Sequence, residues 1–299
     1  MELFARIFPP QPAKAPRVIS KCTIFCHERP QDRLFGGVYS NYLALESACL
    51  DAHARGADEL YCLGDMGAFG PHPDRVFPLL QKYAVTCIRG NYDDSVARGL
   101  DNCQCGYTDP ADNYFARLSY EYTLENTSID NRDFLGSLPE SHRMDIGDFR
   151  VLLCHGSPRR MNEFLWESTT PTHVLEGYCN QFEVDLILAT HTGCHWKRGL
   201  SGNRHFVNVG ALGRPANDGA TNVWYTILTV SESQERTGSS KTAFALDVEF
   251  IPLKYDYEKL AAEMKAEKLP KEFIETILTG WWTTCLEILP FKERVRGKF

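Results

Sequence analysis

Four apolar runs in this chain end in a side chain that carries oxygen or nitrogen lone pairs. The runs ELYCL and TCIR lead, each through a glycine, to Asp65 and Asn91, and the runs VLLC and LILAT lead to His155 and His191. Short apolar runs are typical of buried strands, and ligands of open α/β sheets bind at the carboxyl ends of the strands. We therefore expect these four residues to converge on one edge of the fold.

A carboxylate, an amide oxygen and two imidazoles make a mixed set of oxygen and nitrogen ligands. Such a set suits a divalent transition metal such as Mn, Fe or Zn. Mg²⁺ prefers oxygen ligands and matches two nitrogen ligands poorly. The four residues together predict a transition-metal site, although each of them alone is also common in turns or in a packed core.

The segments that must position these residues alternate between strand-like runs and helical stretches. Residues 41–55 predict a helix with Asn41 as its N-cap. After residue 140 most segments are strands, which predicts an α/β class with mixed sheets. We expect strands at 18–25 and 33–39, an N-terminal arm at 1–17, a main domain at 18–255 with a helical insertion at 101–140, and a C-terminal helical extension at 256–299.

Four segments resemble the motifs of a known family. They are GDMGAFGP from Gly64, GNYD from Gly90, CHGSP from Cys154 and THTG from Thr190. In this order they resemble the G-D, G-N-H-D, H-G and G-H-x-H motifs of the calcineurin-like metallophosphoesterases, in particular their small bacterial phosphodiesterase-like branch. The resemblance covers about residues 33–253. It implies a four-layer αββα sandwich of two mixed β-sheets, and a phosphoester hydrolase with two metal ions.

The chain departs from the family pattern at one of the two metal positions. The first-motif Asp and His of the family are Gly37 and Tyr39 here, and the last His of G-H-x-H is Gly193. The resemblance implies that this metal keeps Asp65 alone, whereas the ligands of the other metal are complete. We expect one firmly held ion. A second ion would need the substrate or unusual ligands, such as His195 or the 22–27 segment.

Two further residues are candidates for acid–base chemistry. The histidine of G-N-H-D is Tyr92 in this chain, and a phenol can donate a proton but is a poor base at neutral pH. We expect Tyr92 and Asp93 to lie near the leaving group. His195 is a third catalytic candidate, and a packing role is the alternative for it.

Three residues are candidates for substrate contact. Asn41 begins a predicted helix, and helix N-termini offer N–H groups to anions. Arg214 can hold phosphate oxygens through two parallel bonds. Tyr39 belongs to a predicted aromatic rim that either stacks on a substrate or fills the space of the lost ligands. A solvated surface charge is the alternative role for Arg214.

The chain contains eleven cysteines, a high and odd number. The spacing of Cys22, Cys26 and His27, and of Cys103 and Cys105, is compatible with Zn²⁺ or an iron–sulfur centre. Buried structural thiols are the simpler interpretation. A disulfide scaffold is not expected, because a chain of this length buries an adequate core without one.

Composition narrows the class of partner. The 299 residues carry a formal net charge of −7, which disfavours nucleic acid. No apolar run reaches the roughly 20 residues that cross a bilayer, and the first residues lack a signal-peptide pattern. We expect a cytoplasmic protein without membrane contact that acts on a small phosphorylated substrate. A helix around Trp281-Trp282 is predicted to pack on the sandwich or in a homo-oligomer.

Two functions remain open from the sequence. The first is a metal-dependent phosphomonoesterase or phosphodiesterase that activates water at one metal site. The second is a catalytically inactive protein of the same fold that binds a ligand or a partner. The complete ligand set favours the hydrolase, and the lost ligands favour the binding module.

Overall fold

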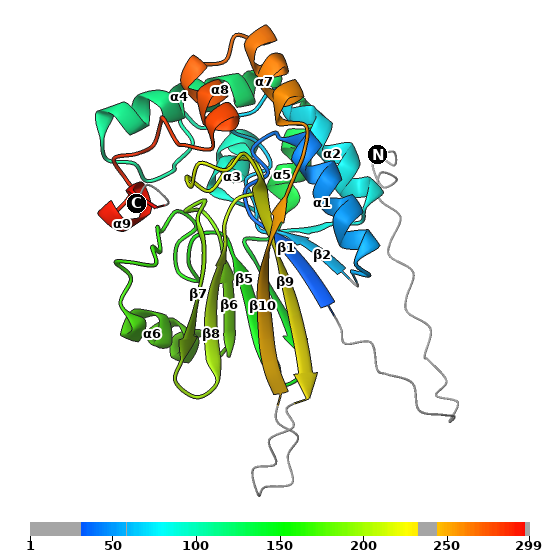
Figure 1. Ribbon diagram of the computed structural model, residues 1–299, viewed down its shortest axis with the longest axis vertical. Helices are drawn as coiled ribbons and strands as arrows, with labels where there is room; N and C mark the ends of the chain where they lie inside the picture. Colours follow the sequence, from blue (N-terminus) through cyan, green and yellow to red (C-terminus); the bar gives the residue numbers. More distant parts are fainter. Residues whose placement is uncertain (1–30, 58, 233–243, 297–299) are drawn as a thin grey trace, which may run out of the picture.

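The computed structural model describes residues 31–57, 59–232 and 244–296. Their strands form two five-stranded sheets, with orders β10-β9-β1-β2-β3 and β4-β5-β6-β8-β7 (Figure 1). The strands are β1 (Gln31–Phe35), β2 (Glu59–Cys62), β3 (Thr86–Cys87), β4 (Ser141–Ile146), β5 (Phe149–Cys154), β6 (Leu186–Ala189), β7 (His195–Leu200), β8 (Arg204–Val209), β9 (Val223–Glu232) and β10 (Phe244–Leu253).

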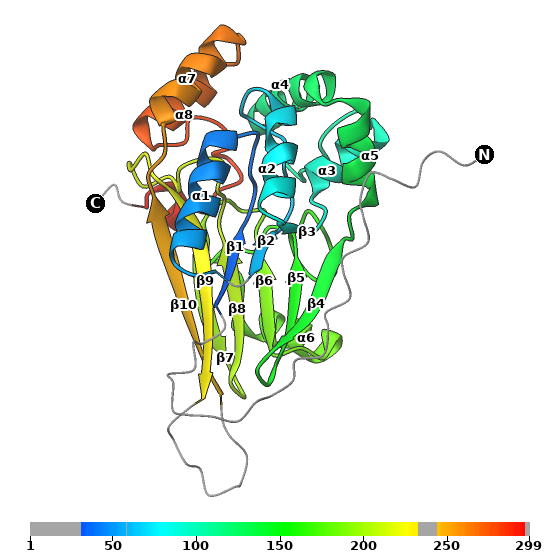
Figure 2. The same cartoon turned by 90° about the vertical axis from the view of Figure 1, so that its right-hand side faces the viewer.

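The helices of the described residues lie outside the sheets and at one end of them (Figures 1 and 2). The predicted helix at 41–55 is confirmed, because the Asn41 side chain caps it by accepting a 3.0 Å hydrogen bond from the Ala44 N–H. The helices are α1 (Tyr42–Ala54), α2 (Val76–Lys82), α3 (Asn91–Arg98), α4 (Pro110–Asn126), α5 (Ile129–Ser137), α6 (Thr172–Phe182), α7 (Tyr257–Ala266), α8 (Lys271–Thr279) and α9 (Phe291–Arg294), with a 3₁₀ turn at Pro73–Arg75.

Parallel strands form the middle of each sheet. In the first sheet β1, β2 and β3 are parallel, and in the second sheet β5, β6 and β8 are parallel. Antiparallel pairing adds β9 and β10 to the first sheet and places β4 and β7 at the edges of the second. The four predicted metal ligands follow β2, β3, β5 and β6, so each sheet supplies two of them.

Three apolar clusters separate four layers. Along β5, Val151 and Leu153 face the other sheet, whereas Leu152 and Cys154 belong to the cluster beneath α6. This alternation is the period of two that a strand imposes. A third cluster joins the first sheet to α1, α2 and the helices at the top of the fold. The order helix, sheet, sheet, helix confirms the predicted αββα sandwich (Figure 2).

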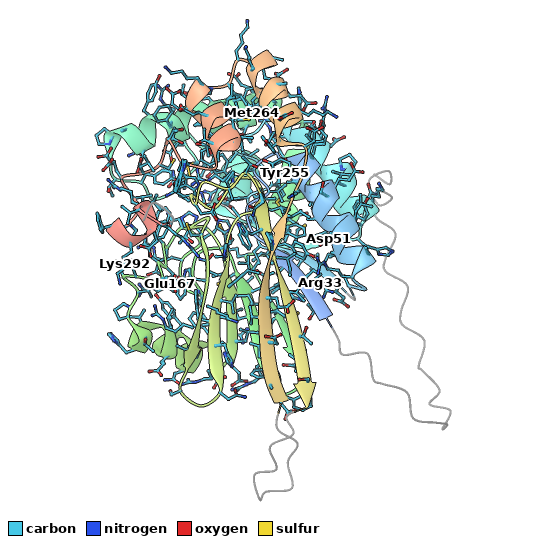
Figure 3. All side chains as sticks on the ribbon, in the orientation of Figure 1. Arg33, Asp51, Glu167, Tyr255, Met264 and Lys292 are labelled. Atoms are coloured by element: carbon cyan, nitrogen blue, oxygen red, sulfur yellow. A yellow bond between two sulfur atoms is a disulfide. The ribbon has the colours of Figure 1, made fainter. Side chains whose placement is uncertain are left out.

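The last part of the chain departs from one expectation. Helices α7 and α8 are separated near Pro270, and Tyr255 and Met264, labelled in Figure 3, mark how α7 follows β10. The segment that contains Trp281 and Trp282 was expected to be a helix and is not one. Helix α8 ends at Gly280, whose φ of +75° terminates the helical backbone.

Some expectations fall on other parts of the chain. The arm at 1–17, the strand at 18–25 and the residues Cys22, Cys26 and His27 lie outside the described residues. Residues 101–140 contain α4 and α5, and residues 256–299 contain α7, α8 and α9. In the described part of the chain, every helix is too short or too polar to cross a membrane.

Candidate metal centre

The structure brings three of the predicted ligands into one cluster. His155 Nε2 lies 3.2 Å from Asp65 Oδ2 and 3.2 Å from His191 Nδ1. Ligand atoms of the three residues all lie within 4.8 Å of one another. Each of the three side chains is buried, and His191 is the most exposed at 8 %. One carboxylate and two imidazoles therefore meet at the carboxyl ends of β2, β5 and β6.

The backbone at these strand ends is bent sharply. Asp65 and His191 have φ values of +59° and +68°, and Gly64 between β2 and Asp65 has +95°. A left-handed conformation costs a residue other than glycine about 1–3 kcal/mol, and such strain is concentrated at functional sites. The bends turn both side chains out of the strand direction and toward His155.

Two glycines allow the loops after β2 and β3 to touch. A Cβ atom at position 90 would lie 2.2 Å from Asp65 Oδ1, and a Cβ at position 64 would lie 2.4 Å from the Gly90 nitrogen. Gly90 has an ordinary φ of −94°, which any residue can adopt. Glycine is therefore needed here because a side chain would clash with its neighbours. The close approach lets the Tyr92 N–H donate a 3.0 Å bond to Asp65 Oδ1.

A hydrogen bond fixes which nitrogen of His155 faces the cluster. His155 Nδ1 lies 2.6 Å from the carbonyl oxygen of Leu63, so this nitrogen carries the proton and donates it. The other nitrogen, Nε2, is then directed at Asp65 and His191. Backbone partners of this kind orient and strengthen metal-binding imidazoles.

The side-chain amide of Asn91 is bonded at one end only. Its Nδ2 donates 2.8 Å to the Cys103 carbonyl and 3.3 Å to Cys105 Sγ. The opposite atom, Oδ1, is buried and has no hydrogen-bond partner, and His191 Nε2 is in the same situation. Buried lone pairs without a partner are costly, and a cation removes that cost. The cluster of Asp65, His155 and His191 thus fits a divalent metal, and Asn91 stays the predicted fourth ligand.

The charges of the cluster depend on each other. Burial raises the pKa of Asp65, but the neighbouring His155 and its hydrogen bond, with His191, lower it below the usual range. Burial likewise works against a charged His155, yet Asp65 raises the pKa of that imidazole above 6.5. Burial and then the positive His155 lower the pKa of His191 to about 3. In the metal-free protein Asp65 and His155 form a buried ion pair beside a neutral His191.

A pH dependence of metal binding follows from this ion pair. A metal ion and a proton compete for the same nitrogen of His155, so the metal must displace the proton. Because the pKa of His155 is raised above 6.5, this competition begins already above pH 6.5. We expect the affinity for Mn²⁺ to fall by about tenfold per pH unit as the pH drops through this pKa. Calorimetric titrations at several pH values, in buffers of different ionisation enthalpy, should show close to one proton released. An affinity that stays constant from pH 8 to pH 6 contradicts the assignment.

Asp93 connects the backbone of the loops after β2 and β3. Its carboxylate accepts hydrogen bonds from the N–H groups of Asp65, Met66 and Gly90, at 2.7 to 2.9 Å. Burial, with the nearby Asp65 charge, raises its pKa to about 7, against the lowering effect of these backbone donors. These bonds position the two loops, and a place of Asp93 near the leaving group stays a prediction.

Tyr92 and Asn41 are also bonded within the fold. The Tyr92 hydroxyl lies 2.9 Å from Ser119 Oγ on α4, and burial raises the pKa of this phenol. Asn41 is fully buried, and its Nδ2 donates 3.0 Å to the Gly213 carbonyl while its oxygen caps α1. Helix packing and capping thus occupy the polar atoms of both side chains. The roles of Tyr92 at a leaving group and of the N–H groups at the start of α1 in anion binding stay predictions.

His195 lies apart from the cluster. Its ring packs 4.4 Å from the ring of Trp224 and 4.6 Å from that of Phe250, measured between centroids. Burial and then Arg296 lower its pKa to about 4. Aromatic packing determines where this ring lies, which corrects the expectation that His195 replaces the lost family histidine.

Tyr39 and Arg214 lie near each other, and Tyr39 lies beside Gly37. The Tyr39 ring fills the space beside Gly37, where a Cβ would lie 2.3 Å from a ring carbon. The Arg214 guanidinium lies 6.0 Å from the centre of that ring. In the described part of the chain, no second group of three or more His, Cys, Asp or Glu side chains lies close enough together to hold a metal.

The site contains residues that the sequence did not indicate. Phe164 packs on His191 with 4.3 Å between ring centroids. Cys103 and Cys105 form a disulfide and are therefore not thiolate ligands, and this loop anchors Asn91. The contact of Phe164 with His191 carries no sequence motif, and the spacing of Cys103 and Cys105 indicated ligand chemistry and not a bond to the loop of Asn91, so only the fold shows these roles.

Comparison with known proteins identifies the family. The profile of the calcineurin-like phosphoesterase superfamily domain matches residues 40–233. Because the match spans more than half of the chain, the chain belongs to this superfamily. The residues that form the cluster all lie inside the matched range.

Individual relatives are distant. An uncharacterised protein of Methanocaldococcus jannaschii is 23 % identical over 257 residues, which is 81 % of this chain and 95 % of the relative. Two solved structures cover 85 % of this chain. They are a hypothetical protein of Pyrococcus horikoshii, with TM-score 0.66, 21 % identity and 99 % of its length matched, and a metallophosphoesterase of Sphaerobacter thermophilus, with TM-score 0.60, 23 % identity and 100 % of its length matched. At this identity the two structures support the fold.

Proposed function

We propose that the protein is a phosphoester hydrolase that uses one divalent transition metal, Mn, Fe or Zn, held by Asp65, Asn91, His155 and His191. The observation that carries the proposal is the buried Oδ1 of Asn91, which has no partner and belongs to the residue that follows β3. Membership of the superfamily supports phosphoester chemistry for the same site.

The residues of the chain have separate tasks in this proposal. Asp65 supplies negative charge from a carboxylate that the Tyr92 N–H orients. His155 presents Nε2 because Leu63 holds its other nitrogen. Asp93 keeps the Asp65 loop in place through three backbone donors. When bound, a divalent metal supplies Lewis acidity and makes water a stronger acid near neutral pH.

The substrate in this proposal is a small phosphorylated molecule, either a phosphomonoester or a phosphodiester. The four ligand residues are between 1 % and 8 % exposed, and such an enclosed site suits a small substrate better than a polymer. The cytoplasmic location and a homo-oligomer stay predictions.

Hydrolysis of two chromogenic esters tests the proposal. Metal-depleted protein should be inactive toward 4-nitrophenyl phosphate and bis(4-nitrophenyl) phosphate, and activity should return with Mn²⁺, Fe²⁺ or Zn²⁺. The ratio of the two rates separates a monoesterase from a diesterase. Equal rates for His155→Ala and the natural chain with every metal would contradict the proposal.

A catalytically inactive binding module is the second candidate. The loss of ligands at Gly37, Tyr39 and Gly193, and the burial of the cluster, favour it. This candidate predicts that the chain binds one metal tightly and still turns over neither ester. The same pair of measurements, metal content and hydrolysis, therefore separates the two functions.

A further inference from the structure

A buried arginine without a carboxylate partner lies next to Gly193, in the loop that follows His191. Arg214 is 6 % exposed, and its Nε is buried with no hydrogen-bond partner. The ion pairs found among the described residues do not include it. A buried charge is costly unless something compensates it, so a guanidinium in this position requires an explanation.

Aromatic rings hold the guanidinium on its flat sides. Its central carbon lies 3.4 Å from the ring centre of Trp282 and 4.7 Å from that of Phe69. Trp282 is itself fixed, because its Nε1 donates 2.7 Å to the Pro215 carbonyl. Stacking stabilises the cation, but it uses only the faces of the guanidinium. The N–H donors project in the plane and are suited to bind an anion bidentately.

The arginine occupies the surroundings of the lost metal position. A Cβ at Gly193, where the family carries its last histidine, would lie 3.8 Å from Arg214 Nε and 3.0 Å from Trp282. A Cβ at Gly37, the first-motif Asp position, would meet the Tyr39 ring. The places of the missing ligands are thus filled by a cation and two aromatic side chains.

The loop that carries Arg214 is tied to the metal centre. The Gly213 N–H donates 2.8 Å to the Gly37 carbonyl, and the Val38 N–H donates 2.8 Å to the Asp65 carbonyl. Asp65 and Arg214 also both act on the Tyr39 hydroxyl, whose pKa is raised by burial and then by Asp65, and lowered by Arg214. Backbone hydrogen bonds through residues 37 and 38 thus connect the Arg214 loop to the loop that carries Asp65.

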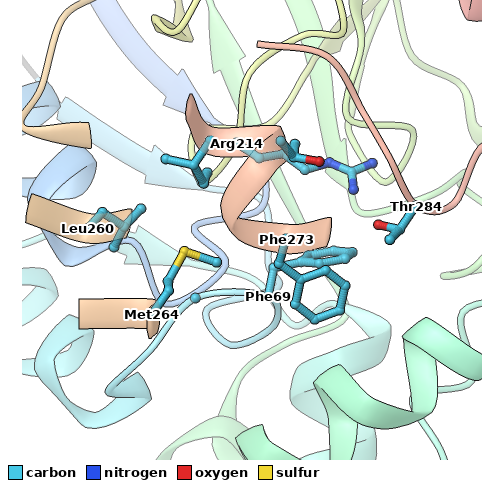
Figure 4. A pocket seen from close by; sticks show the side chains of 10 residues that line it. Phe69, Arg214, Leu260, Met264, Phe273 and Thr284 are labelled. Carbon is cyan, nitrogen blue, oxygen red and sulfur yellow. The ribbon is translucent and has the colours of Figure 1, made fainter. Parts of the chain in front are cut away.

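The other side of Arg214 leaves little room. The cavity between Phe69, Arg214, Leu260 and Met264 has a volume of about 10 Å³ (Figure 4). That volume is barely enough for one water molecule. A phosphoryl group has no space in that cavity, and Gly193, which follows His191 by two residues, is the neighbour of Arg214 Nε that leads to the metal centre.

We propose that Arg214 is a fixed cationic replacement for the second metal ion, and that its guanidinium binds the phosphoryl oxygens of the substrate beside the single metal. The inference rests on the proposed function, because it assigns a residue to the same site. The arginine contributes one permanent positive charge and a planar fork of donors. No proton or electron is transferred in this role.

Binding of inorganic phosphate to the full-length, Mn²⁺-loaded protein tests the inference. By calorimetry at fixed ionic strength, Arg214→Gln should bind phosphate at least about tenfold more weakly, the loss expected for hydrogen bonds to a charged group. Arg214→Lys keeps the charge without the fork and should show a smaller loss. Arg198→Gln is the matched control, since Arg198 also stacks on a tryptophan, at 5.1 Å, and should leave phosphate affinity unchanged.

Metal content provides the readout that separates binding from folding. All variants should hold one Mn²⁺ per chain, and phosphate should recruit no second ion to the natural protein. If Arg214→Gln does not fold, Arg214→Lys alone tests the inference. Weaker phosphate binding by Arg214→Lys than by the natural chain then supports it. Phosphate affinity equal to that of the natural chain in the folded variants, or a second ion arriving with phosphate, overturns the inference.

The same experiment distinguishes a failure of the proposed function. Metal-free protein should still bind phosphate, more weakly and with the same dependence on Arg214. If Arg214-dependent phosphate binding persists but no ester is hydrolysed, the hydrolase proposal fails and the role of the arginine stands. If hydrolysis requires the metal but neither hydrolysis nor phosphate binding depends on Arg214, the hydrolase proposal stands and the role of the arginine fails.

Discussion

Replacing His155 by alanine should remove both the metal and the activity. His155 Nε2 lies 3.2 Å from a carboxylate oxygen and 3.2 Å from the second imidazole, so its loss opens the middle of the ligand set. Removing a residue that merely supports a ligand costs about 10–100-fold in metal affinity or activity. Loss of the ligand itself should therefore exceed about 100-fold in kcat/KM for either chromogenic ester.

The design of this experiment separates the site from general damage. His173→Ala is the matched control, because His173 is exposed on α6, and it should keep metal and activity. Since His155→Ala leaves a buried Asp65 without its partner, His155→Gln is measured in parallel as a less disruptive change. A His155→Gln protein that folds, binds one metal with natural affinity and hydrolyses normally contradicts the site.

Replacing Gly90 by alanine should destabilise the protein although the backbone accepts alanine. The φ of Gly90 is −94°, but a Cβ there would lie 2.2 Å from Asp65 Oδ1 and 2.9 Å from His155 Cε1. Forcing an extra methyl group into a packed region costs about 1–3 kcal/mol in free energy of unfolding. We expect a loss near the upper end of that range, together with at least about tenfold weaker metal binding, because the methyl group displaces ligands.

Gly177→Ala is the matched comparison for this prediction. Gly177 lies within α6, and a Cβ there meets nothing within 4 Å. Alanine in an exposed helix interior should stabilise the protein by about 0.5–1 kcal/mol. Urea unfolding and metal titration of both variants make the comparison. Equal stability of Gly90→Ala and the natural protein means that the loops after β2 and β3 do not touch as described.

The elements around the site could be predicted because strands carry a strong local signal. Asp65, His155 and His191 follow short apolar runs, and parallel strands bring their carboxyl ends together wherever the sheets lie. The α/β class with mixed sheets followed from the same runs, and the order of the four layers was what the family resemblance implied. No long-range detail was needed to expect that these three residues meet.

The packing and hydrogen-bond partners of the predicted residues could not be predicted from these local patterns. Whether the Tyr92 hydroxyl faces a substrate or Ser119 depends on how α4 crosses α3, which no local pattern encodes. The ring of His195 follows β7 into a contact with β9 and β10 for the same reason. A sequence motif identifies the type of a residue, whereas tertiary packing determines its partners.

The unusual part of the site arises from a distant segment. Trp282 lies in the C-terminal part of the chain, where apolar residues predicted a packing helix, and Gly280 ends the helix before it. The irregular segment after Gly280 instead places Trp282 on Arg214. The loss of metal ligands at Gly37 and Gly193 and the aromatic packing of Arg214 are thus two aspects of one rearrangement.

An anomalous-scattering map of crystals grown with Mn²⁺ tests the central claim most directly. Data collected at the absorption edge of the metal should show one ion per chain, bound by Asp65, Asn91, His155 and His191, with none beside Tyr39 and Arg214. A map with no ion at the four residues, or with a second ion between Tyr39 and Gly193, would contradict the account.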